Sequence, residues 1–120
     1  MPRTNIAAQT TPGPYPTIPL TPDSRDIAFV GANVADGNDT ALVAGKTLVI
    51  VRNVDVGAHT VSFASQPDTL NRKGDITDYS VGAGQSALFG PFTTIGWAAA
   101  GRLQINGDNV NVEIAVITLP

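Results

Sequence analysis

Few side chains in this sequence are able to do chemistry. His59 is the single histidine, and cysteine is absent, which excludes thiolate metal ligands and cysteine nucleophiles. Asp55, Thr60 and Ser62 lie near His59, but no Gly-x-Ser-x-Gly or comparable nucleophile motif accompanies them. A zinc site needs three or four ligands, and one histidine with scattered aspartates falls short. We therefore expect no enzyme activity, no catalytic or metal-binding residue and no cofactor.

The aspartates fall mostly among turn-forming residues, where capping of the backbone accounts for them. Paired acids for glycoside hydrolysis stay an open alternative at this point. The segment 35–39, Ala-Asp-Gly-Asn-Asp, is dense in oxygen ligands but lacks the spacing of an EF-hand calcium loop. We predict an ordinary turn there, with a calcium site as the alternative.

The polar stretch 65–75, SQPDTLNRKGD, is the longest irregular segment. A loop of this length is often functional, and its adjacent cations Arg72 and Lys73 are the residues that we expect to bind a partner. A solvated connection is the plain alternative. A glycan-binding platform would combine this loop with Tyr79 and Trp97, although a single tryptophan after an apolar strand is more typical of a core residue.

Residues 1–22 differ from the rest of the chain, because they hold six of its nine prolines. Proline cannot donate to a sheet ladder and favours an extended backbone. We predict an extended N-terminal arm that is dispensable for folding and held by a neighbouring subunit. Its anchors would be the sparse apolar residues Ile6, Tyr15, Ile18 and Leu20. A plain tail is the alternative.

Strand chemistry dominates the remainder. The stretch 45–63, GKTLVIVRNVDVGAHTVSF, predicts two strands in a β-hairpin-like unit. Its apolar run 48–51 is typical of a strand buried on both faces or at a sandwich core. Val61 and Phe63 alternate with Ser62, as in a half-buried strand.

The turn signal Asn106-Gly107 between apolar runs predicts a second hairpin at the C-terminal end. Lysine and glutamate, which helices use, are scarce. We predict one all-β domain over residues 23–120, an antiparallel β-sandwich or jelly-roll-like barrel of about eight short strands. Its predicted core is Leu48, Ile50, Val61, Phe63, Phe89, Ile105, Val112 and Ile114.

The amino-acid composition limits which classes of partner the chain is expected to bind. Charged residues make up 14% of the chain, against roughly 25% in an ordinary soluble domain. Either other proteins cover much of the surface, or threonine, asparagine and glutamine keep it soluble. The formal net charge of −3 offers no basic patch for nucleic-acid phosphates. No apolar run approaches the length of a membrane span, and no signal peptide is expected.

The stretch GKTLVIVRN…GAHTVSF resembles the strand, loop and His-Thr-Val strand of cupredoxins, in which the histidine binds copper. The resemblance would assign copper to His59. That family also needs a cysteine and a second histidine, and this chain has neither, so type 1 copper is excluded. We expect the His59 ring to hydrogen-bond to backbone at the start of a strand.

A broader resemblance spans most of the chain and is to small β-sandwich structural proteins of tailed bacteriophages, often encoded beside the major capsid protein. It is carried by the proline-rich arm with Gly13-Pro14-Tyr15-Pro16, by GKTLVIVRN with AHTVSF, and by later motifs. Those motifs are Gly74-Asp75-Ile76-Thr77 with Tyr79, Gly90-Pro91-Phe92, Gly96-Trp97 and the ending Leu119-Pro120.

The resemblance implies a capsid decoration (cement) protein made in the host cytoplasm and located on the virion surface. Its implied partners are the major capsid protein and other copies of itself, with a trimer as the preferred order, and neither nucleic acid nor membrane. The alternative is a carbohydrate- or host-surface-binding β-sandwich module.

Overall fold

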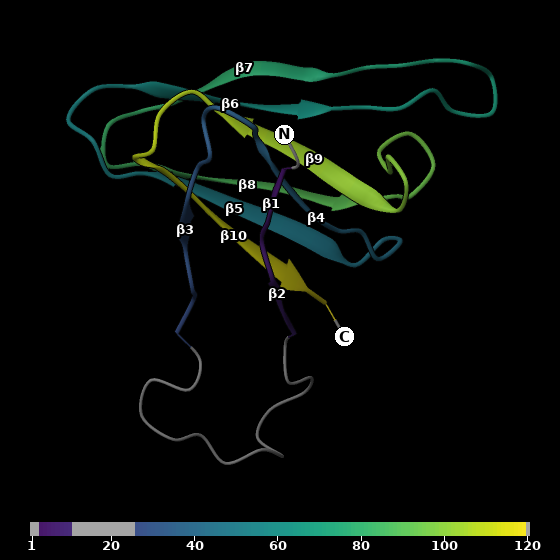
Figure 1. The fold of residues 1–120 in the computed structure, drawn as a ribbon, viewed down its shortest axis with the longest axis horizontal. Helices are drawn as coiled ribbons and strands as arrows, with labels where there is room; N and C mark the ends of the chain where they lie inside the picture. The colour runs from purple at the N-terminus through teal and green to yellow at the C-terminus, as the bar shows by residue number, and fades with distance from the viewer. Residues whose placement is uncertain (1–2, 11–25, 120) are drawn as a thin grey trace, which may run out of the picture.

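A computed structural model describes residues 3–10 and 26–119, and in these residues the chain forms ten strands and no helix. The strands, shown in Figure 1, are β1 (Thr4–Asn5), β2 (Ala8–Thr10), β3 (Val30–Gly31), β4 (Asn38–Ala41), β5 (Thr47–Asn53), β6 (His59–Ala64), β7 (Ile76–Val81), β8 (Ser86–Phe92), β9 (Arg102–Gly107) and β10 (Val112–Thr118). The prediction of an all-β domain is confirmed. The number of strands is higher than the predicted eight.

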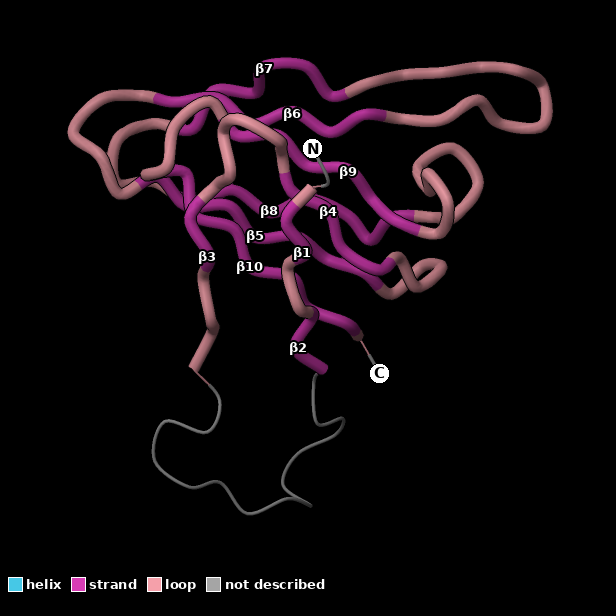
Figure 2. The backbone as a smooth tube through the Cα atoms, in the orientation of Figure 1, coloured by secondary structure: helices cyan, strands magenta, loops and turns pink. Residues whose placement is uncertain are grey.

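Two sheets make up the domain. The first sheet has the order β1-β4-β9-β6-β7, and the second has the order β2-β10-β5-β8, with β3 also paired to β10. Figure 2 shows β6 and β7 of the first sheet along one side of the molecule, and β10 and β2 of the second sheet toward the other. Most pairs are antiparallel, but β1–β4 and β2–β10 are parallel, so the sheets are mixed rather than purely antiparallel as predicted.

The core lies between the two sheets. Five of the eight predicted core residues are buried there, namely Val61, Phe63, Ile105, Val112 and Ile114, and Phe89 packs against them. The ring of Phe63 is central, because its centroid lies 4.7 Å from that of Phe89 and 5.4 Å from that of Phe92. Such tilted aromatic contacts add to the stabilisation that burial provides.

The register predicted for β5 is wrong by one residue. Val49 and Val51 are fully buried, whereas Leu48 and Ile50 point to the outer face. Side chains alternate between the two faces of a strand, so a shift of one residue exchanges inside and outside. The run Leu-Val-Ile-Val contains no polar residue that could reveal the buried face.

Neither predicted hairpin forms. β5 lies in the second sheet and β6 in the first, so residues 54–58 cross between layers. β9 pairs with β4 and β6, and β10 pairs with β5. Asn106-Gly107 therefore ends β9. Gly107 is buried, and a Cβ at this position would stand only 2.7 Å from that of Ala32. This glycine serves a close packing contact instead of a hairpin turn.

The predicted arm is wrong for residues 3–10, which belong to the domain. β1 pairs with β4 of the first sheet and β2 with β10 of the second, so this segment runs from one sheet to the other. Ile6, between them, is 1% exposed and part of the core. Arg3 donates to the Asn106 side chain at 2.7 Å, close to Gly37, where any Cβ would collide with its guanidinium.

Candidate functional site

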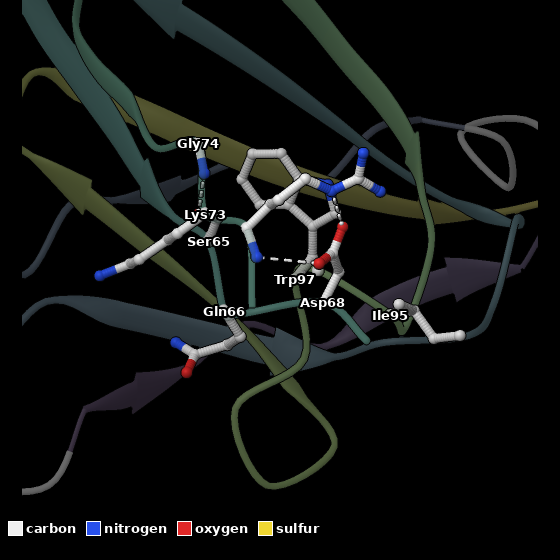
Figure 3. A pocket seen from close by; sticks show the side chains of 9 residues that line it. Ser65, Gln66, Asp68, Lys73, Gly74, Ile95 and Trp97 are labelled. Atoms are coloured by element: carbon white, nitrogen blue, oxygen red, sulfur yellow. Dashed lines mark hydrogen bonds and ion pairs between the residues drawn. The ribbon is translucent and has the colours of Figure 1, made fainter. Parts of the chain in front are cut away.

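The loop 65–75 and the turn after β8 meet at one end of the sandwich (Figure 1). The backbone N–H of Gln66 donates to the carbonyl of Gly96 at 2.6 Å and joins them. Between them lies an open pocket of about 400 Å³, the loop-end pocket (Figure 3). It is lined by Ser65, Gln66, Asp68, Arg72, Lys73, Gly74, Ile95, Gly96 and Trp97. The structure thus brings the predicted residues Arg72 and Lys73 to the same pocket as Trp97.

Asp68 organises one wall of the pocket. Its Oδ1 accepts the backbone N–H groups of Leu70 and Arg72, each at 2.9 Å, and its Oδ2 accepts Nε of Arg72 at 2.8 Å. The hydrogen bond from the backbone of Arg72 is the main reason that the pKa of Asp68 lies below its usual value. The carboxylate is therefore ionised at neutral pH and fixes both the loop and the base of the Arg72 guanidinium.

Asp75 closes the loop at its other end. Its Oδ1 accepts the backbone N–H of Ser65 at 2.8 Å and the Ser65 hydroxyl at 3.0 Å. The Ser65 oxygen in turn accepts the N–H of Gly74 at 2.8 Å, and Ser65 is 3% exposed. The bond from the Ser65 backbone, with that from its hydroxyl, lowers the pKa of Asp75.

These bonds predict an acid-sensitive loop. A carboxyl whose pKa is lowered by folding stabilises the folded form above its unfolded pKa of about 3.9, and this contribution is lost as pH falls through the lower folded value. We expect Trp97 fluorescence to show a local transition below about pH 4, and Asp75→Asn to weaken its pH dependence. Identical acid transitions in the wild type and in Asp75→Asn would contradict this expectation.

Trp97 both packs against the core and lines the pocket, which are the two positions that the sequence left open for it. Its ring meets that of Phe92 edge-on at a centroid distance of 5.1 Å, and it packs against the core while lining the pocket. Residues 94–97 form a turn, and the N–H of Ala98 donates to Thr94 O at 3.0 Å. Tyr79, on β7, is not part of the pocket. Its ring lies edge-on to that of Phe89, on β8.

His59 stands at the start of β6, as predicted, but it contacts carboxylates rather than backbone. Its Nε2 lies 2.8 Å from Oδ2 of Asp55, and its Nδ1 lies 3.4 Å from Oδ1 of Asp108. The contact with His59 is the main reason that the pKa of Asp55 is lowered. In residues 3–10 and 26–119, no three His, Cys, Asp or Glu side chains stand where they could hold a metal ion.

The four predicted arm anchors have separate outcomes. Ile6 is buried in the core of its own chain, so it is not exposed for a neighbouring subunit. Tyr15, Ile18 and Leu20 lie outside the described residues. Thr4 to Thr10 contain no proline, and this gap in the proline-rich segment is the signal that could have distinguished a strand from an arm.

Sequence reasoning missed an apolar surface on the second sheet. Its outer face carries Leu48 and Ile50 from β5, Leu88 from β8 and Ile117 from β10, and register places Ile50 beside Leu88 and Leu48 beside Ile117. Leu88 is 64% exposed, whereas Leu48, Ile50 and Ile117 are half-buried. Ala115, which register places beside Ile50, is buried. An antiparallel sheet with one solvated face normally alternates apolar and polar residues. We call these four residues the outer apolar face.

The outer apolar face ends at an ion pair. Arg52 Nε lies 2.6 Å from Glu113 Oε1, and the guanidinium carbon of Arg52 lies 3.9 Å from the centroid of the Phe29 ring. The two opposite charges leave this face without net charge.

No protein-family model, curated protein or solved structure matches the chain. Among the described residues no helix has the length and apolar character required to cross a membrane. The function is therefore inferred from the residues and surfaces described above.

Proposed function

We propose that this chain is a structural virion protein, a decoration (cement) protein that binds the outside of a tailed-phage head and stabilises it by bridging subunits. The observation that supports this most is the outer apolar face, Leu48, Ile50, Leu88 and Ile117. Apolar side chains that share one outer sheet face and are at least partly open to solvent are candidates for a protein interface. A protein that works by covering and clamping its neighbours needs such a face and needs no catalytic set.

We infer that the outer apolar face lies against another copy of the chain. The chain carries a formal charge of −3, so copies repel one another unless they meet on a neutral surface. The outer apolar face is such a surface, because Arg52 and Glu113 cancel each other at its end. Self-association, with a trimer as the preferred order, then multiplies weak contacts with the major capsid protein through effective concentration.

The strand order supports the finer description of the fold as a jelly roll. Without β1 and β2, the sheets have the orders β4-β9-β6-β7 and β3-β10-β5-β8, and every pair within them is antiparallel. Two interleaved four-stranded sheets of this kind are the double Greek key of jelly rolls, which occur in viral capsid and lectin domains.

The second candidate function is a carbohydrate- or host-surface-binding module. The loop-end pocket favours it, because Trp97 lies beside polar side chains at the open end of the sandwich. Aromatic rings with a few polar groups are typical of small-ligand sites. Binding of the purified protein to a glycan array, lost in Trp97→Ala, would favour this function over the first.

Co-sedimentation tests the decoration function. The purified chain should bind heads of the phage that encodes it, prepared without the protein, and should raise their resistance to heat. Leu88→Asp should make the protein monomeric in light scattering and weaken its binding to heads roughly tenfold or more, because a carboxylate in an apolar interface loses its hydration.

Val56→Asp is the matched control, since Val56 is 96% exposed and lies on the loop after β5. It should bind heads as the wild type does. Failure of the wild-type protein to bind heads at all, or equal binding by Leu88→Asp, would contradict the proposal.

A further inference from the structure

Two oxygen-bearing groups of the loop-end pocket already bind within their own loop. The Asp68 carboxylate already accepts three N–H groups from its own loop, at 2.8 to 2.9 Å. The Ser65 hydroxyl accepts from Gly74 and donates to Asp75. Both of these oxygen-bearing groups are therefore occupied within the loop, and neither has the geometry of a group waiting for a ligand.

The cations of the pocket are differently placed. Arg72 uses Nε to bind Asp68, and in the described part of the chain its two Nη atoms have no hydrogen-bond partner, while its side chain is 72% exposed. The same holds for Nζ of Lys73, which exerts only a longer-range charge effect on Asp75. Asp68 thus orients Arg72 through its Nε atom. The two Nη atoms at the outer edge of the guanidinium stay open, in the geometry that suits a carboxylate.

Apolar side chains complete the pocket. Trp97 is half-buried and held edge-on by Phe92, and Ile95 is 63% exposed at the rim. Figure 3 shows Trp97 and Asp68 close together, with Ile95 to one side and Lys73 to the other, where the Lys73 ammonium points outward from the pocket. A ligand that fits this arrangement has an anionic head and a short apolar stem, as glutamate and aspartate side chains do.

We propose that the loop-end pocket binds an acidic side chain, glutamate or aspartate, of a protein partner through Arg72 and Lys73. This inference rests on the proposed function, which makes the partner a protein. A neutral saccharide fits less well, because it has no negative charge to pair with the Arg72 guanidinium and the Lys73 ammonium. Nucleic-acid phosphate fits less well too, because the acidic chain repels a polyanion outside this pocket.

Trp97 makes the test direct, since it is the only tryptophan of the chain and lines the pocket. The purified full chain is titrated with an acetylated and amidated peptide of alternating glutamate and serine, and binding is followed by tryptophan fluorescence. The glutamate peptide should shift the emission in a salt-sensitive manner. The same peptide with glutamine in place of glutamate should bind about tenfold more weakly or not at all.

Two variants locate the contact. Arg72→Gln and Lys73→Gln should each weaken binding of the glutamate peptide, Arg72→Gln by about tenfold. Lys73 makes no hydrogen bond within the described residues, so Lys73→Gln keeps the test valid if Arg72→Gln loosens the loop. Lys46→Gln is the matched control for Lys73→Gln, because Lys46 is an exposed lysine on the turn before β5 and lies outside the pocket. Its affinity should equal that of the wild type.

Equal binding of the two peptides, unchanged affinity in both pocket variants, or tighter binding of glucuronate or inorganic phosphate than of the glutamate peptide would overturn the inference. The same variants in head co-sedimentation separate it from the decoration function. Peptide binding that depends on Arg72 without any binding to heads leaves the pocket assignment intact and removes the decoration function. If Arg72→Gln and Lys73→Gln bind heads as the wild type does, the decoration function stands and the pocket is not the contact with the head.

Discussion

Replacing Ile6 with alanine should lower the free energy of unfolding by about 2–5 kcal/mol, as truncation of a buried isoleucine does. Ile6 is 1% exposed and belongs to the cluster of buried residues between the sheets. Its N–H donates to Asp39 O at 2.8 Å, and its carbonyl accepts the Thr40 hydroxyl at 2.8 Å, so the backbone is fixed and cannot collapse easily into the cavity.

Urea unfolding of the two proteins, with Ile95→Ala as the control, measures this effect. Ile95 undergoes the same change in chemistry but is 63% exposed, so its variant should lie close to the wild type. Deletion of residues 1–10 should destabilise at least as much as Ile6→Ala, since it also exposes the edges of β4 and β10. Unchanged stability in Ile6→Ala would mean that the N-terminal segment is a dispensable arm after all.

The N-terminal segment also shows why its place was hard to predict. A strand that adds to a sheet edge needs little apolar surface, and here Ile6 is the only large buried side chain that residues 3–10 contribute. What holds the segment is ladder hydrogen bonds and polar contacts such as Arg3 with Asn106 and Arg102 with Asn5. These contacts are more than 90 residues apart in sequence, and no local pattern encodes them.

Local pattern did predict the β class and most of the core. β6, β9 and β10 alternate clearly, so Val61, Phe63, Ile105, Val112 and Ile114 were correctly predicted to be buried. Pairing between strands is a different matter. Asn106-Gly107 has the residues of a tight hairpin, yet the chain passes there from one sheet to the other, because tertiary packing overrides turn propensity.

The candidate site was partly predictable for the same reason. The loop length and its cations could be recognised in the sequence, and so could Trp97 as a candidate neighbour. That Gly96 meets Gln66, and that Tyr79 faces Phe89 instead, depends on how β8 and β9 lie against β6 and β7. The occupied state of the Asp68 carboxylate, which decides what the pocket can bind, is visible only in three dimensions.

The register of β5 gives the second large effect. Val49→Asp should unfold the domain or leave it barely stable, whereas Ile50→Asp, one residue further, should fold. Val49 is fully buried between the sheets, and an unpaired carboxylate there costs several kcal/mol. A domain of this size has about 5–15 kcal/mol of stability in total. Ile50 is half-buried on the outer face beside the exposed Leu88, so a carboxylate there is not enclosed between the two sheets.

Circular dichroism and thermal unfolding of the two variants distinguish the registers. The sequence alone placed Ile50 in the core, and that register requires Ile50→Asp to be the damaging change. In the observed register Ile50→Asp keeps its melting temperature within a few degrees and loses self-association, because it places charge beside Leu88 in the proposed interface. A folded Val49→Asp protein together with an unfolded Ile50→Asp protein would overturn both the register of β5 and the outer apolar face that depends on it.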